Sequence, residues 1–146
     1  MNTDSISFSP TITVVDDDPS LLNVMTMLLQ HIGAVPITFP DGVSALNHLK
    51  QNTPDLIILD LMLPDINGLD VLRIVRRMRH LDYTPVLIMT AYADPDFVRQ
   101  GMELGADSYV TKPYLANSLI DHVRLLLKVG RRPSKSSPPP SLDKSS

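Results

Sequence analysis

The sequence predicts a doubly wound α/β fold, in which helices cover both faces of a parallel sheet. Three largely apolar runs, at residues 12–15, 56–59 and 86–89, are typical of strands that are buried on both faces. Segments with apolar residues at helical spacing separate these runs from one another and from two weaker strand-like runs. This alternation of five strands and five helices implies parallel pairing through right-handed crossovers, with the three most apolar strands in the centre of the sheet.

The first two helices are predicted by their capping residues and by their apolar faces. Asp18 can cap a helix that has Pro19 at its first position and that ends at Gly33. A strand over residues 35–39 follows, and Asp41 then opens the second helix. The residues expected to face the core are Leu21, Leu22, Met25, Leu28, Leu29 and Ile32 in the first helix and Val43, Leu46 and Leu49 in the second.

The remaining three helices are predicted by the same signals. The third begins near Asn67 and Gly68, the fourth opens at Asp94 and stops before Gly105, and the fifth runs over about residues 115–129. The inward residues of the third and fifth helices are Leu69, Leu72, Val75 and Met78, and Leu119, Val123, Leu126 and Leu127. We interpret the arginines of the third helix as a solvated surface rather than a binding patch; they are Arg73, Arg76, Arg77 and Arg79.

The composition excludes several classes of protein. A chain of 146 residues with 43% hydrophobic residues fits one domain with a substantial core, here over residues 11–129. The absence of cysteine excludes a disulfide framework, thiolate zinc sites and cysteine catalysis. No apolar stretch approaches the length of a membrane span, and residues 1–10, which we expect to be flexible, lack the features of a signal peptide. We therefore expect a cytoplasmic protein without a membrane partner.

The charge is unevenly distributed between the predicted domain and the tail at residues 130–146. The tail has four basic residues and one acidic residue, so its charge is +3. Because the charge of the whole chain is −3, the other residues together carry a charge of −6. Because so acidic a body lacks the clustered cations that displace phosphate counterions, we expect no direct nucleic-acid binding by this chain. The tail is rich in Pro and Ser, so we expect it to be disordered, as a linker or a natural end, with docking to an acidic partner or serine phosphorylation as alternatives.

Reactive side chains follow four of the five predicted strands. Asp16 and Asp17 follow the first, Asp60 the third and Lys112 the fifth, while Thr90 ends the fourth. The carboxyl ends of parallel strands meet at one edge of the sheet, where folds of this kind bind their ligands. Carboxylates that converge there repel one another unless a hard cation lies among them. The sequence therefore predicts a magnesium site, which manganese could also occupy, beside a carboxylate nucleophile.

Each of these residues also has an ordinary structural interpretation. Asp60 could simply open a turn, a threonine at a strand end is usually structural, and a lone lysine is usually exposed to solvent. Together, however, the side chains supply what phosphoryl transfer to a carboxylate requires. A metal and an ammonium group neutralise the phosphoryl oxygens, and a hydroxyl group binds one of them.

The motifs, taken in order, resemble those of the receiver domain of two-component response regulators. The resemblance covers about residues 11–128 and rests on four stretches: Val14-Val15-Asp16-Asp17, residues 59–68 with the sequence LDLMLPDING, Met89-Thr90-Ala91 and Lys112-Pro113. It implies a flavodoxin-like sheet with the strand order 2-1-3-4-5. It also implies that Asp60 is the phosphoacceptor, with Asp17 as a direct magnesium ligand, Asp16 as a ligand through water and the Met62 backbone oxygen as a third protein contact.

The resemblance implies further roles around the phosphoacceptor. Thr90 would bind a phosphoryl oxygen and move inward on activation, and Lys112 would pair with the phosphoryl group. Tyr109 occupies the position of the family's switch aromatic residue, although it could be an ordinary half-buried strand tyrosine. The bond between Lys112 and Pro113 is the candidate for a cis peptide. Tyr92, two residues after Thr90, would lie with the side chain of Met62 at the mouth of the site.

The function expected from these residues is that of a phosphorylation-controlled switch. A sensor histidine kinase or a histidine phosphotransfer protein would donate the phosphoryl group, and the chain would catalyse its own phosphorylation and dephosphorylation. The face formed by the fourth helix, fifth strand and fifth helix would then present the change to an unknown output protein or to a second copy in a phosphorylation-dependent homodimer.

Other functions remain open at this point. A phosphohydrolase with an aspartate nucleophile would need an acid or base two residues after Asp60, where this chain has Met62. An unphosphorylated scaffold would not need the complete set of reactive residues. The chain could also be the receiver fragment of a larger regulator, for example one that binds DNA through another domain.

Overall fold

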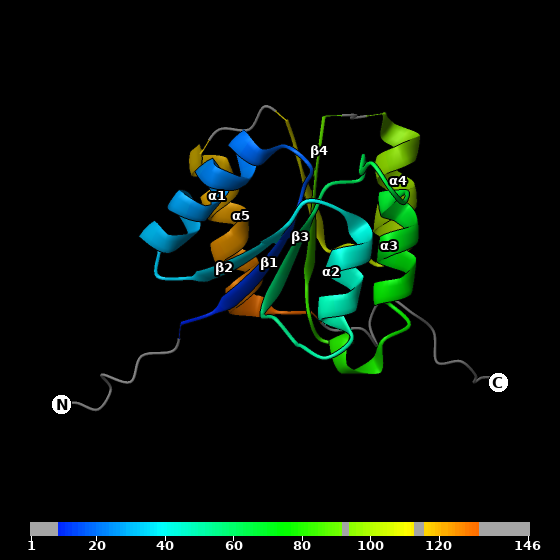
Figure 1. Cartoon of the computed structure of the whole chain (residues 1–146), viewed down its shortest axis with the longest axis horizontal. Coiled ribbons are helices and arrows are strands. Elements are labelled where there is room, and N and C mark those ends of the chain that lie inside the picture. Colours follow the sequence, from blue (N-terminus) through cyan, green and yellow to red (C-terminus); the bar gives the residue numbers. More distant parts are fainter. Residues whose placement is uncertain (1–8, 92–93, 113–115, 132–146) are drawn as a thin grey trace.

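A five-stranded parallel sheet with helices on both faces organises the computed structural model, which describes residues 9–91, 94–112 and 116–131 (Figure 1). The strand order is β2-β1-β3-β4-β5, and every neighbouring pair is parallel. The fold and strand order are those predicted, and the most apolar strands, β1, β3 and β4, are central. The elements in chain order are β1 (Thr11–Val15), α1 (Pro19–His31), β2 (Val35–Phe39), α2 (Gly42–Leu49), β3 (Leu56–Leu59), α3 (Gly68–Val75), η2 (Arg79–Leu81), β4 (Val86–Thr90), α4 (Pro95–Glu103), β5 (Ser108–Thr111) and α5 (Ala116–Val129).

The helices begin at the predicted capping residues. The Asp18 carboxylate accepts hydrogen bonds from the backbone amides of Ser20 and Leu21, so two amides at the start of α1 have partners. Comparable side-chain caps open α2, α3 and α4, at Asp41, Asn67 and Asp94. These polar signals lie within a few residues of the groups that they satisfy, which explains why the sequence reveals them.

The core consists of two clusters, one on each face of the sheet. In β3, Ile57 and Leu59 belong to the cluster with α2 and α3, whereas Leu56 and Ile58 belong to the cluster with α1 and α5. All four side chains are fully buried, as the unbroken apolar run predicts for a strand covered on both faces. Figure 1 shows α1 and α5 on one side of the sheet and α2, α3 and α4 on the other.

Two inward assignments along the helices are wrong or incomplete. Val43 is 53% exposed, while Ala45 is buried beside Leu46 and Leu49. The buried stripe of α2 therefore follows Ala45, Leu46 and Leu49, which leaves Val43 outside it. Helix α3 ends at Val75, and Met78 instead precedes the short η2 helix, which the sequence pattern did not predict, although Met78 still packs against the core.

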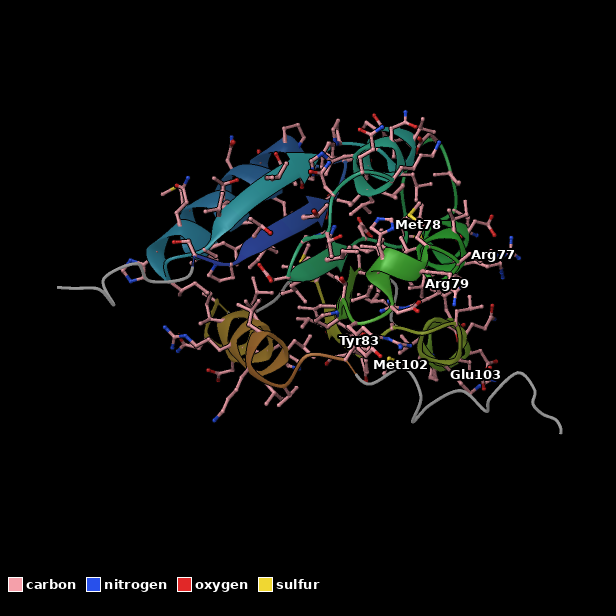
Figure 2. All side chains as sticks on the ribbon, turned by 90° about the horizontal axis from the view of Figure 1, so that it is seen from below. Arg77, Met78, Arg79, Tyr83, Met102 and Glu103 are labelled. Atoms are coloured by element: carbon pink, nitrogen blue, oxygen red, sulfur yellow. The ribbon has the colours of Figure 1, made fainter. Side chains whose placement is uncertain are left out.

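The interpretation of the α3 arginines is wrong for Arg76. Its side chain is largely buried and donates hydrogen bonds to the backbone oxygens of Leu81, Thr84 and Gly105. Arg77 and Arg79, by contrast, are exposed on the surface shown in Figure 2. Helical spacing could not separate these roles, because the partners of Arg76 lie in η2, in the loop before β4 and in the loop after α4.

Several predictions concern residues outside the described part of the chain. They are the flexibility of residues 1–8, the disorder of residues 132–146, the cis peptide at Pro113 and the position of Tyr92. Among the residues that the structure does describe, no helix is both long enough and apolar enough to cross a membrane.

Candidate functional site

The ends of the central strands bring the predicted site residues together. In the sheet register Val15 pairs with Leu59, so the residues that follow, Asp16 and Asp60, start from neighbouring positions. The Asp60 amide donates a hydrogen bond to the Val15 oxygen over 2.9 Å, which continues the ladder one residue beyond the strands. The position of the acids thus follows from the parallel pairing of β1 with β3.

The fourth and fifth strands supply the hydroxyl and the ammonium group. Thr90 is the last residue of β4 and is completely buried. The backbone amide of Lys112 donates a hydrogen bond to the Thr90 oxygen over 2.8 Å, directly after β5. Both residues therefore lie at the same edge of the sheet as the acids.

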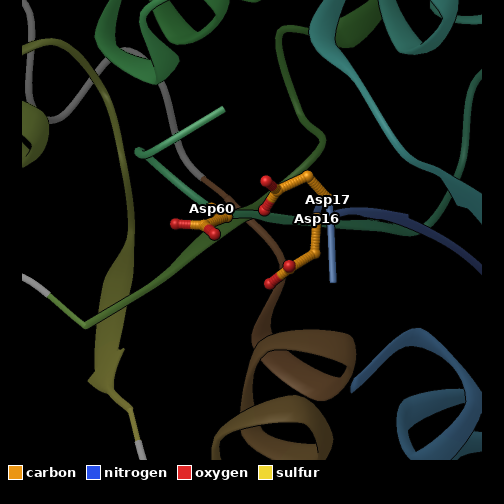
Figure 3. Close-up of side chains that lie close together, drawn as sticks. All are labelled: Asp16, Asp17 and Asp60. Atoms are coloured by element: carbon orange, nitrogen blue, oxygen red, sulfur yellow. The ribbon is translucent and has the colours of Figure 1, made fainter. Parts of the chain in front are cut away.

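Three carboxylates gather at this edge. One oxygen from each of Asp16, Asp17 and Asp60 lies within 4.8 Å of the other two. Figure 3 shows the three side chains where β1 and β3 end. Asp16 and Asp60 are buried, with Asp60 only 2% exposed, whereas Asp17 is exposed to solvent. The cluster thus consists of two buried acids, Asp16 and Asp60, and of Asp17 at the surface, where an ion could enter.

Lys112 lies between the two buried acids. Its Nζ atom lies 2.7 Å from Oδ2 of Asp16 and 2.9 Å from Oδ2 of Asp60. The contact with Asp60 is a hydrogen bond, and the contact with Asp16 is an ion pair. The other carboxylate oxygens bind the chain itself, because the Asp18 amide donates to Oδ1 of Asp16 and the Met62 amide donates to Oδ1 of Asp60.

The pKa values of Asp60 and Lys112 reflect their burial and their contacts with each other. Burial raises the pKa of Asp60 above its ordinary value, with a smaller contribution from the Asp16 charge, although the Met62 amide and Lys112 oppose the rise. Burial alone would lower the pKa of Lys112, but its contacts with Asp16 and Asp60 outweigh burial and raise that pKa. Lys112 therefore stays charged at neutral pH, and the partners of Asp60 only partly offset the effect of burial on the pKa of that carboxylate.

The donor set fits a hard divalent cation. Three carboxylates face one ammonium group, so the cluster retains an excess of negative charge. Carboxylate and backbone oxygens are the ligands that Mg²⁺ and Mn²⁺ prefer. We conclude that these residues could hold such an ion.

A hollow of about 510 Å³ lies beside the cluster, and Asp17, Met62, Pro64, Asn67 and Phe97 contribute to its lining. The Met62 side chain is 56% exposed, as expected for a residue at the mouth of the site. The sequence analysis did not identify Phe97 as a residue of this hollow. Phe97 belongs to α4, and an apolar residue in a predicted helix does not by itself indicate a site.

The remaining predicted residue, Tyr109, does not contact the acids directly. It pairs with Ile88 in the sheet register and is 45% exposed on the edge strand β5.

The sequence analysis gave no separate role to Asp65, whose carboxylate accepts hydrogen bonds from the amides of Gly42 and Val43. No local motif connects Asp65 to a helix that begins 23 residues earlier, so only the folded chain reveals this contact.

Comparison with known proteins identifies the family of the chain. Residues 12–124 match the family model of the response regulator receiver domain. The chain is 42% identical over 117 residues to the DNA-binding response regulator MtrA of Mycolicibacterium smegmatis, covering 80% of this chain and 50% of that protein. It is 36% identical over 128 residues to the transcriptional regulatory protein AfsQ1 of Streptomyces coelicolor, covering 88% and 56%. The chain thus spans about half the length of the curated relatives that it matches.

Solved structures give the same result. The BeF3-activated DrrB receiver domain is 34% identical, with a TM-score of 0.76, over 83% of this chain and 99% of that chain. The receiver domain of the Francisella response regulator 1452 is 31% identical, also with a TM-score of 0.76, over 82% and 98%.

Proposed function

This chain belongs to the family of response regulator receiver domains of two-component systems, and on that premise we propose that Asp60 accepts the phosphoryl group. The observation that carries the proposal is the setting of Asp60. Its buried carboxylate follows a central strand, contacts the ammonium group of Lys112 and lies within the acidic cluster. The donor would be a phosphohistidine of a sensor histidine kinase or of a histidine phosphotransfer protein.

In the proposed reaction, a carboxylate oxygen of Asp60 attacks the phosphorus atom. An oxygen–phosphorus bond forms and the phosphorus–nitrogen bond of the donor breaks, so the imidazole leaves with the electron pair and takes a proton from solvent. Lys112, now 2.9 Å from Asp60, would transfer its contact to a phosphoryl oxygen, and the Thr90 hydroxyl would bind another. Charge neutralisation of the phosphoryl oxygens is the chemistry that magnesium supplies when Asp17, Asp60 and the Met62 backbone oxygen hold it, with Asp16 acting through water.

Phosphorylation would act by shifting an equilibrium between inactive and active conformations. Thr90 and Tyr109 are the residues proposed to change position, since they lie on neighbouring strands, β4 and β5. The surface of α4, β5 and α5 would carry the change to an output protein or to a second copy of the chain. The domain itself would catalyse both the gain and the loss of the phosphoryl group.

A second proposal concerns the full regulator. The chain covers 50% of a relative named as a DNA-binding response regulator, and 56% of one named as a transcriptional regulatory protein. We propose that it can function as the receiver part of such a regulator, in which nucleic-acid binding would belong to the other half. Gel-shift measurements on the complete gene product and on residues 1–146 alone would test this, because only the complete protein should bind DNA.

Incubation with a small phosphodonor and magnesium tests the first proposal. Intact mass spectrometry should show one added phosphoryl group, which Asp60→Asn and chelation of the metal should each abolish. Asp70→Asn, which changes an exposed acid on α3, provides the matched control and should be modified as the wild type is. Modification that persists in Asp60→Asn, for example on a serine of the tail, would contradict the assignment.

A further inference from the structure

We propose that Asp65 is a positioning residue for metal binding, which holds the loop that carries Met62 at its distance from Asp16 and Asp17. This inference rests on the proposed function, since it concerns the same metal site. The loop at residues 61–67 joins β3 to α3 and supplies the backbone oxygen of Met62. An oxygen ligand on a loop is effective only if the loop is fixed, because Mg²⁺ demands near-ideal octahedral geometry.

The Asp65 carboxylate binds the start of α2 with both of its oxygens. Oδ1 accepts a hydrogen bond from the Gly42 amide and Oδ2 accepts one from the Val43 amide, each over 2.9 Å. The helix dipole favours a negative charge at this position. Asp65 therefore forms a two-point link between the loop and an element that is 22 to 23 residues away in the sequence.

Direct packing beside the carboxylate supports the same link. A Cβ atom at Gly42 would lie only 2.2 Å from Cγ2 of Ile66 and 3.0 Å from Cγ2 of Val71. Ile66 thus packs on the bare backbone of Gly42, which only glycine allows. The polar link and the apolar contact are independent observations, and both hold the loop against α2.

The start of α2 is in turn connected to the acids of β1. The Asp16 amide donates a hydrogen bond to the Phe39 oxygen over 3.1 Å, and Phe39 lies three residues before Gly42. On the other side of the site, the Met62 amide binds the Asp60 carboxylate over 3.0 Å. Asp65 therefore completes a series of contacts that begins at Asp16 and reaches the loop that carries Met62 through the start of α2. This series sets the distance between the Met62 backbone oxygen and the carboxylates of Asp16 and Asp17.

A plain helix cap is the alternative role for Asp65, and Asp41 allows the two roles to be separated. Asp41 caps the same end of α2 by accepting hydrogen bonds from the amide and the hydroxyl of Ser44. In contrast to Asp65, Asp41 is part of the segment just before α2 rather than of the 61–67 loop. If Asp65 acts only as a cap, the removal of either carboxylate should have similar consequences.

Calorimetric titration of the phosphate-free protein with Mg²⁺ alone tests the inference. Asp65→Ala should weaken Mg²⁺ binding on the order of tenfold, as the loss of groups that orient metal ligands commonly does. Asp41→Ala should leave the affinity within about twofold while lowering the thermal unfolding midpoint. Hydrogen exchange should also accelerate at the Met62 amide in Asp65→Ala but not in Asp41→Ala. If Asp65→Ala does not fold, Asp65→Asn replaces it, because the amide cannot accept from both backbone groups.

The results separate this inference from the function on which it rests. Wild-type affinity in Asp65→Ala, or equal weakening in Asp41→Ala, would overturn the positioning role. A wild-type protein that binds no Mg²⁺ would instead contradict the proposed metal site itself.

Discussion

Two clusters of charged side chains lie at opposite ends of the sheet, and they differ in how far the chain itself balances their charges. At the carboxyl end, Asp16, Asp17 and Asp60 face the single ammonium group of Lys112. At the amino end, the side chains of Arg76 and Arg131 lie 3.2 Å and 3.4 Å from the carboxylate of Asp107, and the charge of Asp82 also acts on Arg76 to raise its pKa. The first cluster has an excess of negative charge, whereas the cations of the second cluster have carboxylates of the chain beside them.

The charged groups of the second cluster also bind neutral groups of the chain. Arg76 donates to the backbone oxygens of Leu81, Thr84 and Gly105, and Asp107 accepts a hydrogen bond from the Val86 amide. Burial, together with the nearby charge of Arg131, lowers the pKa of Arg76 to about 10, which still leaves it charged at neutral pH. The backbone partners of Arg76 connect this network to the fold, while Nε of Arg131 has no hydrogen-bond partner among the described residues. The acidic cluster, by contrast, has a donor set that could hold a cation from solution.

The largest expected effect is the loss of stability in Arg76→Ala. Without the guanidinium group, three backbone oxygens lose a donor and the half-buried Asp107 keeps the Val86 amide and Arg131 as partners. This change should lower the free energy of unfolding by about 3 kcal/mol. Urea denaturation would measure the change, and Arg77→Ala, which removes an exposed arginine, should stay within about 0.5 kcal/mol. Magnesium affinity should be unaffected while the protein is folded. A stable Arg76→Ala protein with weakened magnesium binding would reverse the roles of the two clusters.

The second prediction concerns Asp17→Asn. Loss of the exposed acid should weaken Mg²⁺ binding by about 10-fold to 100-fold, while stability without metal should rise slightly because repulsion within the cluster falls. Calorimetry and metal-free thermal melts would measure the two quantities separately. Unchanged magnesium affinity would remove Asp17 from the ligand set.

The sequence predicted the acidic cluster far better than the basic one. Asp16, Asp17 and Asp60 follow apolar strands, and parallel pairing alone brings strand ends together, so the pattern is sufficient. Arg76 depends on carbonyl groups in two loops whose path no periodicity specifies. The same limit applies to Asp65, whose partners lie in another element.

The helices show the same division between local and distant causes. Capping residues such as Asp18 act on amides two or three positions away, so the predicted starts of α1, α2, α3 and α4 agree with the structure. Val43 was assigned inward because a valine at helical spacing suggests burial, yet the stripe of α2 that meets the core includes Ala45 instead. Burial of small residues depends on the shape of the opposing surface, which the sequence does not display.

A third prediction uses pH to distinguish the clusters. Burial raises the pKa of both Asp60 and Asp107 above the ordinary value of 3.8, so the folded protein binds these protons more readily than the unfolded chain. Their contributions to stability should therefore become more favourable as the pH falls toward 3.8. Asp60→Asn should remove its share of this trend, and saturating Mg²⁺ should suppress the same share in the wild type. Urea denaturation at several pH values would measure how the free energy of unfolding depends on pH. A dependence that saturating Mg²⁺ leaves unchanged would argue against Asp60 as a ligand.

The smallest predicted effect concerns the lifetime of phosphorylated Asp60. The side chain of Met62 is exposed at the mouth of the site and offers no useful hydrogen bond to orient an attacking water molecule. Met62→Asn combined with Tyr92→Ala should shorten the lifetime several-fold, less than the tenfold change that about 1.4 kcal/mol represents. Decay of the phosphorylated protein after removal of the donor would measure it. Equal or slower decay in the double variant would mean that other groups control water access.

The most direct test of the contrast between the clusters is a thermal melt at increasing Mg²⁺ concentration. An ion that binds only the folded chain stabilises it by about 2.7 kcal/mol at a concentration of 100 times Kd. The melting midpoint of the wild type should therefore rise with Mg²⁺, and Asp107→Asn should show the same rise from a lower starting value. Asp60→Asn should show little or no rise. A rise that persists in Asp60→Asn but disappears in Asp107→Asn would contradict the account, because magnesium would then act at the opposite end of the sheet.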